Sequence, residues 1–138
     1  MERVKLTEED QVRAVLENIA ESFSKLDFTA WLENFHAQPM VLTHDACMSP
    51  TNSADAETLM NPIAESMRAR GFTRTSIDAC SVKLLSPTSS LASVAFTRFA
   101  GEEVLERIGA TYVLQKREGC WGVLLVAAHD PDLPVLAT

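Results

Sequence analysis

The stretch GATYVLQKREGCWGVLLVAAHD, residues 109–130, decides the fold interpretation because it contains two apolar segments around one turn. Glu118-Gly119 is a turn signal between segments rich in aromatic and β-branched residues, so the pattern predicts a β-hairpin. The second segment, 123–128, has no polar side chain on either face. Because a strand of an antiparallel sheet usually has one wet face, we expect both faces of this strand to be covered.

The register of this hairpin determines which side chains share a face. With a turn of Glu118-Gly119 alone, Arg117 pairs with Cys120 and Tyr112 pairs with Leu125. The bulkier face is Ile108, Tyr112, Leu114, Trp121, Val123, Leu125 and His129, and the flatter face is Thr111, Val113, Leu124, Val126 and Ala128. We expect helices over the bulkier face and a partner sheet over the flatter one. A three-residue turn with Gly119 in a bulge would change these groupings.

Helix signals dominate the first half of the chain. A capping box at 7–10 precedes apolar residues at intervals of three and four, which predicts a helix over 8–25. Asp27 is expected to cap a second helix that carries Trp31 and Phe35 and ends before Pro39. A short strand over 40–43 should follow this helix.

A third helical region, over 53–70, is expected to kink or restart at Pro62. After Gly71 the period of the apolar residues changes to two, which predicts strands over 73–85, 91–100, 104–116 and 120–128. Helices followed by a meander of strands indicate an α+β protein. We expect one domain, residues 1–138, with N-terminal helices packed on a curved antiparallel sheet.

Composition excludes several classes of function. The 138 residues are 46% hydrophobic and 22% charged, and the net charge of −7 argues against nucleic acid and anionic membrane surfaces as partners. No apolar run is long enough for a membrane span, and the N-terminus has no apolar signal region. Three widely spaced cysteines without a C-x-x-C pair suggest reduced thiols, so we expect a cytoplasmic protein.

Two segments carry a resemblance to a known family. The segment DFTAWLENFHAQPMVLTH, residues 27–44, and the hairpin with Tyr112 before its turn and Trp121 after it resemble the nuclear transport factor 2-like superfamily. That superfamily includes ketosteroid isomerase and the SnoaL-like polyketide cyclases. The resemblance implies a cystatin-like cone, a conical and often apolar pocket between helices and sheet, and a homodimer through the outer face of the sheet.

The enzymatic patterns of the superfamily are only weakly matched. Ketosteroid isomerase uses an aspartate base with a tyrosine and a protonated aspartate at the oxyanion site. Here Tyr112 is the one tyrosine, and the strands over 91–100 and 104–116 contain no aspartate. The Arg, Asp, Asn and Tyr set of the epoxide hydrolases is likewise not recognisable. Isomerase activity of that type is therefore not expected.

Candidate ligand-binding residues are two polar anchors and four aromatic walls. Arg98 lies among apolar residues and either binds a ligand carboxylate or pairs with Glu106 or Asp78. Tyr112 either donates to a ligand oxygen or satisfies its hydroxyl inside the core. The aromatic residues, which form either core or pocket wall, are Trp31, Phe35, Phe96 and Trp121.

Histidines are the candidate catalytic bases because imidazole titrates near neutral pH. His129 is the first choice, because the preferred register places it on the face of Tyr112, and His44 is the second. Each is followed by an aspartate, but neighbouring residues of a strand point to opposite faces, so neither pair forms a dyad directly. No metal-binding spacing and no phosphate-binding loop occur, so we expect neither a metal nor a cofactor.

These observations predict a binding protein for an apolar small molecule. One alternative is a SnoaL-like enzyme that performs proton transfer, cyclisation or dehydration on an apolar carbonyl compound. Another is a structural or interaction domain whose cone is closed. We expect a homodimer through the flatter face of the hairpin, unless Leu133, Val135 and Leu136 of the tail fold back over that face.

Overall fold

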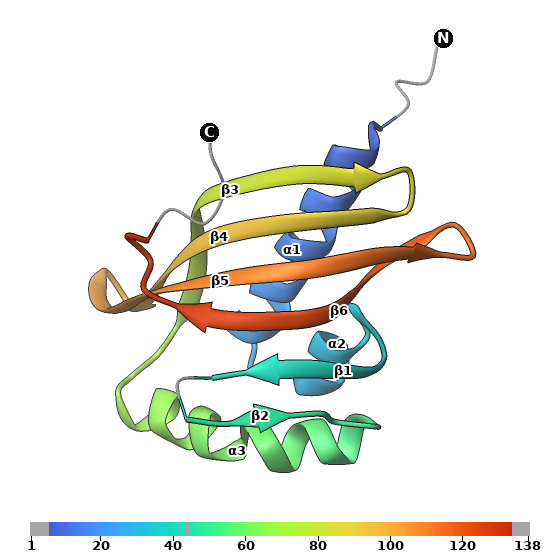
Figure 1. Cartoon of the computed structure of the whole chain (residues 1–138). Helices are drawn as coiled ribbons and strands as arrows, with labels where there is room; N and C mark the ends of the chain where they lie inside the picture. Colours follow the sequence, from blue (N-terminus) through green and yellow to red (C-terminus); the bar gives the residue numbers. More distant parts are fainter. Residues whose placement is uncertain (1–5, 44, 134–138) are drawn as a thin grey trace, which may run out of the picture.

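The computed structural model describes residues 6–43 and 45–133, with Ala37 and Gln38 described by their backbone only. In these residues, helices precede a meander of long strands (Figure 1). The elements are α1 (Glu8–Ser24), α2 (Phe28–Leu32), β1 (Phe35–Leu42), β2 (Cys47–Met48), α3 (Ser53–Ala69), β3 (Arg74–Ser86), β4 (Ser89–Ala100), β5 (Glu103–Arg117) and β6 (Cys120–His129). The predicted α+β layout, with helices on a curved sheet, is confirmed.

Helix α1 forms as its sequence predicts. The hydroxyl of Thr7 accepts from the backbone N–H of Asp10, and the Asp10 carboxylate accepts from the N–H of Thr7 in return. The capping box thus engages N–H groups that the helix itself leaves unpaired. The apolar stripe, which includes Leu16, Ile19 and Phe23, is buried and packs over the sheet. The covered face of the sheet is called the inner face below.

The second helix is shorter than predicted. α2 ends at Leu32, and Phe35 already belongs to strand β1, which pairs in parallel with β6. This pairing joins segments far apart in sequence, and a local pattern does not reveal it. Pro39 lies within β1 at a register irregularity, where the ladder does not need its missing N–H. The prediction that a helix runs through Phe35 to Pro39 is therefore wrong.

Helix α3 runs from Ser53 to Ala69 with Pro62 inside it, so the predicted restart at this proline is wrong. A proline leaves the carbonyl four residues earlier without a helical partner. Here that residue is Thr58, and both Thr58 and Pro62 are exposed. Water can therefore take the place of the lost hydrogen bond, and the helix continues.

The strands form one sheet in the order β2-β1-β6-β5-β4-β3. The predicted meander of β3 to β6 is present, and every neighbouring pair except β1 and β6 is antiparallel. Strand β6 is therefore an interior strand, hydrogen-bonded to β5 on one side and to β1 on the other. This position pairs both edges of its backbone, but it does not by itself account for the apolar side chains that residues 123–128 carry on both faces.

The hairpin register agrees with the prediction near the turn and differs beyond it. Glu118 and Gly119 both have positive φ, as a two-residue turn of a twisted hairpin requires, and Arg117 pairs with Cys120. Leu124 is then an extra residue between the Leu114–Val123 and Val113–Leu125 pairs. Tyr112 consequently pairs with Val126, and the predicted Tyr112–Leu125 pair is wrong.

This bulge exchanges the faces of the last residues of β6. Val126 and Ala128 belong to the inner face with Tyr112, whereas Leu125 and His129 belong to the opposite, outer face. The predicted flat set was therefore wrong for Val126 and Ala128. Figure 1 shows the outer face without a helix across it in the described part of the chain. Of the residues predicted as an alternative cover, Leu133 is 56% exposed, and Val135 and Leu136 lie outside the described residues.

Candidate ligand-binding site

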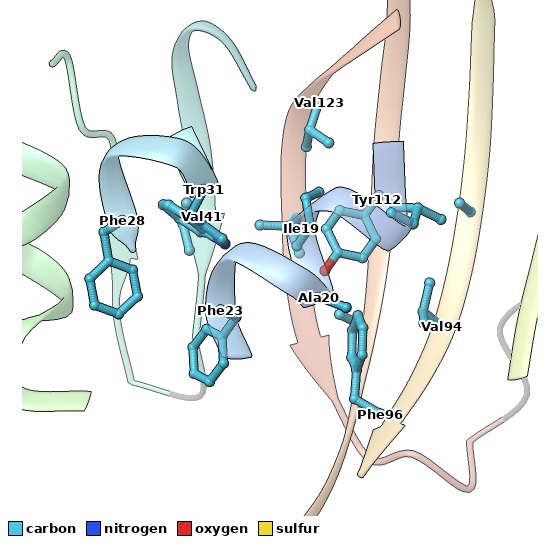
Figure 2. Packing of buried hydrophobic residues seen from close by; sticks show 14 of the residues in the cluster. Ile19, Ala20, Phe23, Phe28, Trp31, Val41, Val94, Phe96, Tyr112 and Val123 are labelled. Atoms are coloured by element: carbon cyan, nitrogen blue, oxygen red, sulfur yellow. The ribbon is translucent and has the colours of Figure 1, made fainter. Parts of the chain in front are cut away.

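A cavity of about 130 Å³ lies between the helices and the inner face of the sheet. Its wall is largely apolar, with side chains from all three helices, β1 and the long strands. The main apolar contributors are Ile19, Phe23, Trp31, Phe35, Met60 and Phe96. Figure 2 shows Tyr112 between α1 and the sheet, close to Ala20 and Phe96. The cavity includes the exposed Ala128, so it reaches the surface at the end of β6.

Apart from the indole of Trp31, four described side chains with hydrogen-bonding groups line this cavity: Thr43, Thr75, Arg98 and Tyr112. Thr43 is engaged, because its hydroxyl exchanges hydrogen bonds with the backbone of Ala46. The other three retain unused hydrogen-bonding capacity. They are the groups available for a ligand.

Tyr112 is 4% exposed and lines the cavity, and Figure 2 shows its hydroxyl directed from the sheet toward α1, near Ala20. In the described part of the chain, its hydroxyl has no hydrogen-bond partner. Burial raises the pKa of Tyr112 far above its ordinary value, because the charged phenolate is poorly solvated there. The side chain is therefore a neutral phenol at physiological pH and can donate one hydrogen bond to a ligand oxygen.

Arg98 combines an ion pair with an unused donor. Its Nη1 lies 3.1 Å from Oε1 of Glu106, so the ion pair that was one of the expected arrangements is present. The guanidinium also lies over the ring of Phe23, with Cζ 4.3 Å from the ring centroid. Its Nε is buried and has no partner among the described groups. Burial lowers the pKa of Arg98, and the nearby Glu106 carboxylate opposes that effect.

Thr75 is the site residue that the sequence analysis missed. It lies on β3 directly opposite Arg98 on β4, and its hydroxyl oxygen is buried without a described partner. Its backbone is fixed by Ser24 at the end of α1, whose hydroxyl lies 2.8 Å from the N–H of Thr75. A threonine in a strand is common, so only the cross-strand pairing with Arg98 identifies it.

Several predicted site residues lie elsewhere. Trp121 does not line the cavity: its indole N–H donates to the Glu8 carboxylate at 2.7 Å, at the beginning of α1. His129 lies on the outer face because of the bulge, and its Nε2 is 2.8 Å from the hydroxyl of Thr111. It therefore does not share a face with Tyr112 as predicted. His44 lies outside the described residues.

The other predicted residues are brought together. Trp31, Phe35, Phe96, Arg98 and Tyr112 all line the one cavity. Among the described lining residues there is no carboxylate and no imidazole. The described residues also contain no cluster of His, Cys, Asp and Glu that could hold a metal ion. In the same part of the chain, each helix is too short or too polar to cross a membrane.

A cone of helices over a curved sheet, with an apolar cavity between them, defines the class of the protein. Residues 8–131 match the family model described as "NTF2-like protein (DUF6841)", and the chain belongs to this NTF2-like family. The search of curated proteins gave no match.

Solved structures with low sequence identity share the fold. A Nostoc punctiforme protein of unknown function with a cystatin-like fold has a TM-score of 0.71 at 15% identity, covering 96% of this chain and 100% of that one. Aln2 from a Streptomyces species has a TM-score of 0.69 at 18% identity, covering 95% and 98%. A ketosteroid isomerase-like protein from Erwinia carotovora atroseptica has 0.67 at 13% identity, covering 90% and 96%. At these identities the likeness establishes the fold alone.

Proposed function

We propose that this protein binds a small apolar molecule that carries an oxygen acceptor, within the cavity between the helices and the sheet. The observation that supports this proposal is the contrast between an apolar wall and three polar side chains with unused donors, Thr75, Arg98 and Tyr112. Binding sites for small molecules usually combine an apolar lining with a few placed polar groups. In a protein without a ligand, side chains would be expected to fill the space between helices and sheet, and the buried polar groups would be expected to have hydrogen-bond partners within the protein.

The same set of side chains favours binding over catalysis by proton transfer. A general base must lie within hydrogen-bond distance of the proton that it removes. The described lining residues offer a neutral phenol, a guanidinium and two hydroxyls, and none of these is a good base at neutral pH. The fold likeness to a ketosteroid isomerase-like protein does not alter this, because function depends on the site rather than on the fold.

Tryptophan fluorescence tests the binding proposal directly, because Trp31 lines the cavity and Trp121 does not. In a Trp121→Phe variant we expect saturable changes in emission on titration with cyclohexanone or isovalerate. The matched Trp31→Phe variant retains Trp121 and should respond weakly. An absence of saturable change, together with an unchanged melting temperature for every probe, would reject the proposal, since a ligand of the native state raises that temperature.

We propose further that two copies of the chain associate through the outer face of the sheet. On this face a row of apolar residues crosses four neighbouring strands: Met40, Leu125, Val113 and Leu91. Met40 is 44% exposed, and none of the four side chains is charged. Two copies related by a two-fold axis would place this row against itself, which an uncharged apolar surface permits.

The cysteines support the proposal of a cytoplasmic location. Cys47 and Cys120 are exposed and Cys80 is half-buried, and all three are free thiols. Exposed free thiols are usual in a reducing compartment and unusual in an oxidising one.

A further inference from the structure

We propose that the ligand is a small monocarboxylate, and that its carboxylate lies between Nε of Arg98 and the hydroxyl of Thr75. This inference rests on the binding function proposed above and specifies the chemical class of the ligand. Nε of Arg98 and Oγ1 of Thr75 are both fully buried side-chain atoms that have no hydrogen-bond partner in the described part of the chain. Both residues line the same cavity.

The geometry of the sheet makes these two groups one site. Thr75 on β3 and Arg98 on β4 are directly opposite in the antiparallel ladder. Residues paired in this way have Cβ atoms about 5 Å apart on the same face. One group offers an N–H and the other an O–H, whereas a carboxylate is an acceptor with two oxygens. A single carboxylate can therefore satisfy both donors, and such charge-assisted hydrogen bonds are the stronger kind.

The local charges favour an anion over a neutral acceptor. Oε1 of Glu106 lies 3.1 Å from Nη1 of Arg98 and 3.3 Å from Nη1 of Arg70, so two guanidinium groups share one carboxylate. These three side chains carry one net positive charge. The Arg98 side chain is 15% exposed, so water screens this charge only in part. A bound carboxylate would balance the charge, while an amide or ketone of the same shape would not.

The size of the cavity limits the rest of the ligand. The volume is about 130 Å³. An engineered apolar cavity of about 150 Å³ takes up benzene, so a small branched or cyclic hydrocarbon group is the expected body. Phe96 and Ile108 pair with each other on β4 and β5 near Arg98 and provide an apolar surface for that group.

Two isosteric probes, isovalerate and its neutral amide isovaleramide, test the proposal by calorimetric titration of the whole protein. We expect isovalerate to bind at least tenfold more tightly, since a hydrogen bond involving a charged group contributes more than one between neutral groups. Equal affinities would overturn the carboxylate inference and leave the binding function intact. Failure of isovalerate, isovaleramide and cyclohexanone to bind would overturn both.

Substitution of Thr75 separates a ligand contact from a structural role. Thr75→Val removes the unpaired hydroxyl at nearly constant shape, so we expect a higher melting temperature without ligand and at least tenfold weaker isovalerate binding. Thr75→Ser should restore the affinity. The matched control is Thr111→Val on the outer face, where the hydroxyl is hydrogen-bonded, so the variant should be less stable and bind normally. A destabilised Thr75→Val protein with unchanged affinity would overturn the inference.

Discussion

Filling the cavity should stabilise the protein, and Ala110→Leu is the substitution that tests this. Ala110 is 5% exposed and lines the cavity from β5. Leucine adds three carbon atoms, and each buried CH₂ contributes about 0.8 kcal/mol, or about 2.4 kcal/mol in total. Ordering the leucine side chain costs about 0.5–1 kcal/mol. If the added atoms enter the cavity, we expect the free energy of unfolding to rise by about 1–2 kcal/mol.

The matched control is Ala92→Leu on the neighbouring strand β4. Ala92 is 0% exposed, pairs with Tyr112 and does not line the cavity. The same added volume must therefore displace packed atoms, which costs about 1–3 kcal/mol. Urea denaturation followed by tryptophan fluorescence measures both variants. If Ala110→Leu is destabilised as strongly as Ala92→Leu, the inner face is packed at both positions, and the reasoning from a cavity is refuted.

Three further perturbations test other parts of the structure. Gly109→Ala should lower the free energy of unfolding by about 1–3 kcal/mol, because its Cβ would lie 2.7 Å from the ring of His129; an unchanged denaturation midpoint would contradict this. Hydrogen bonds from Thr51 lower the pKa of Asp55, so wild type should be more stable than Asp55→Asn above the ordinary pKa of 3.8. This difference in stability should disappear as the pH falls through the lower, folded-state pKa. Thermal denaturation at a series of pH values measures the difference, and a constant difference would reject the prediction. Leu125→Lys should convert a dimer into a monomer in sedimentation experiments, and a wild-type monomer at micromolar concentration would exclude the proposed assembly.

The parts of the fold that were predicted correctly are those with local signals. The capping box of α1 and the two-residue turn of the last hairpin each involve residues within a few positions of one another. Their hydrogen bonds and backbone conformations follow from nearby residue types. These signals therefore identified α1 and the hairpin turn from the sequence alone.

The errors at Phe35 and in β6 depend on how strands pair rather than on local residue types. Phe35 belongs to a strand because it pairs with Val123, and the helical spacing of its neighbours does not show this. The bulge at Leu124 changes the face on which the later residues of β6 lie, and the apolar run offers no polar residue that would mark this change. The assignments of Val126 and His129 failed for this one reason.

The aromatic residues that line the cavity were predicted from the sequence, whereas its polar residues were predicted only in part. The expected aromatic residues Trp31, Phe35 and Phe96 line the cavity, as large apolar side chains between helices and a sheet should. Thr75 was missed because its significance depends on Arg98, which is opposite it in the sheet but distant in the sequence. A strand threonine such as Thr75 becomes a candidate only when the register is known and its hydroxyl is seen to lack a partner.

A crystal structure of the protein soaked with isovalerate tests the central claim most directly. We expect one ligand inside the cavity, with its hydrocarbon body against Phe96 and Ile108 and its carboxylate within hydrogen-bond distance of Nε of Arg98 and Oγ1 of Thr75. A cavity filled by shifted side chains of Phe23 and Phe96, with no isovalerate between the helices and the sheet, would contradict it.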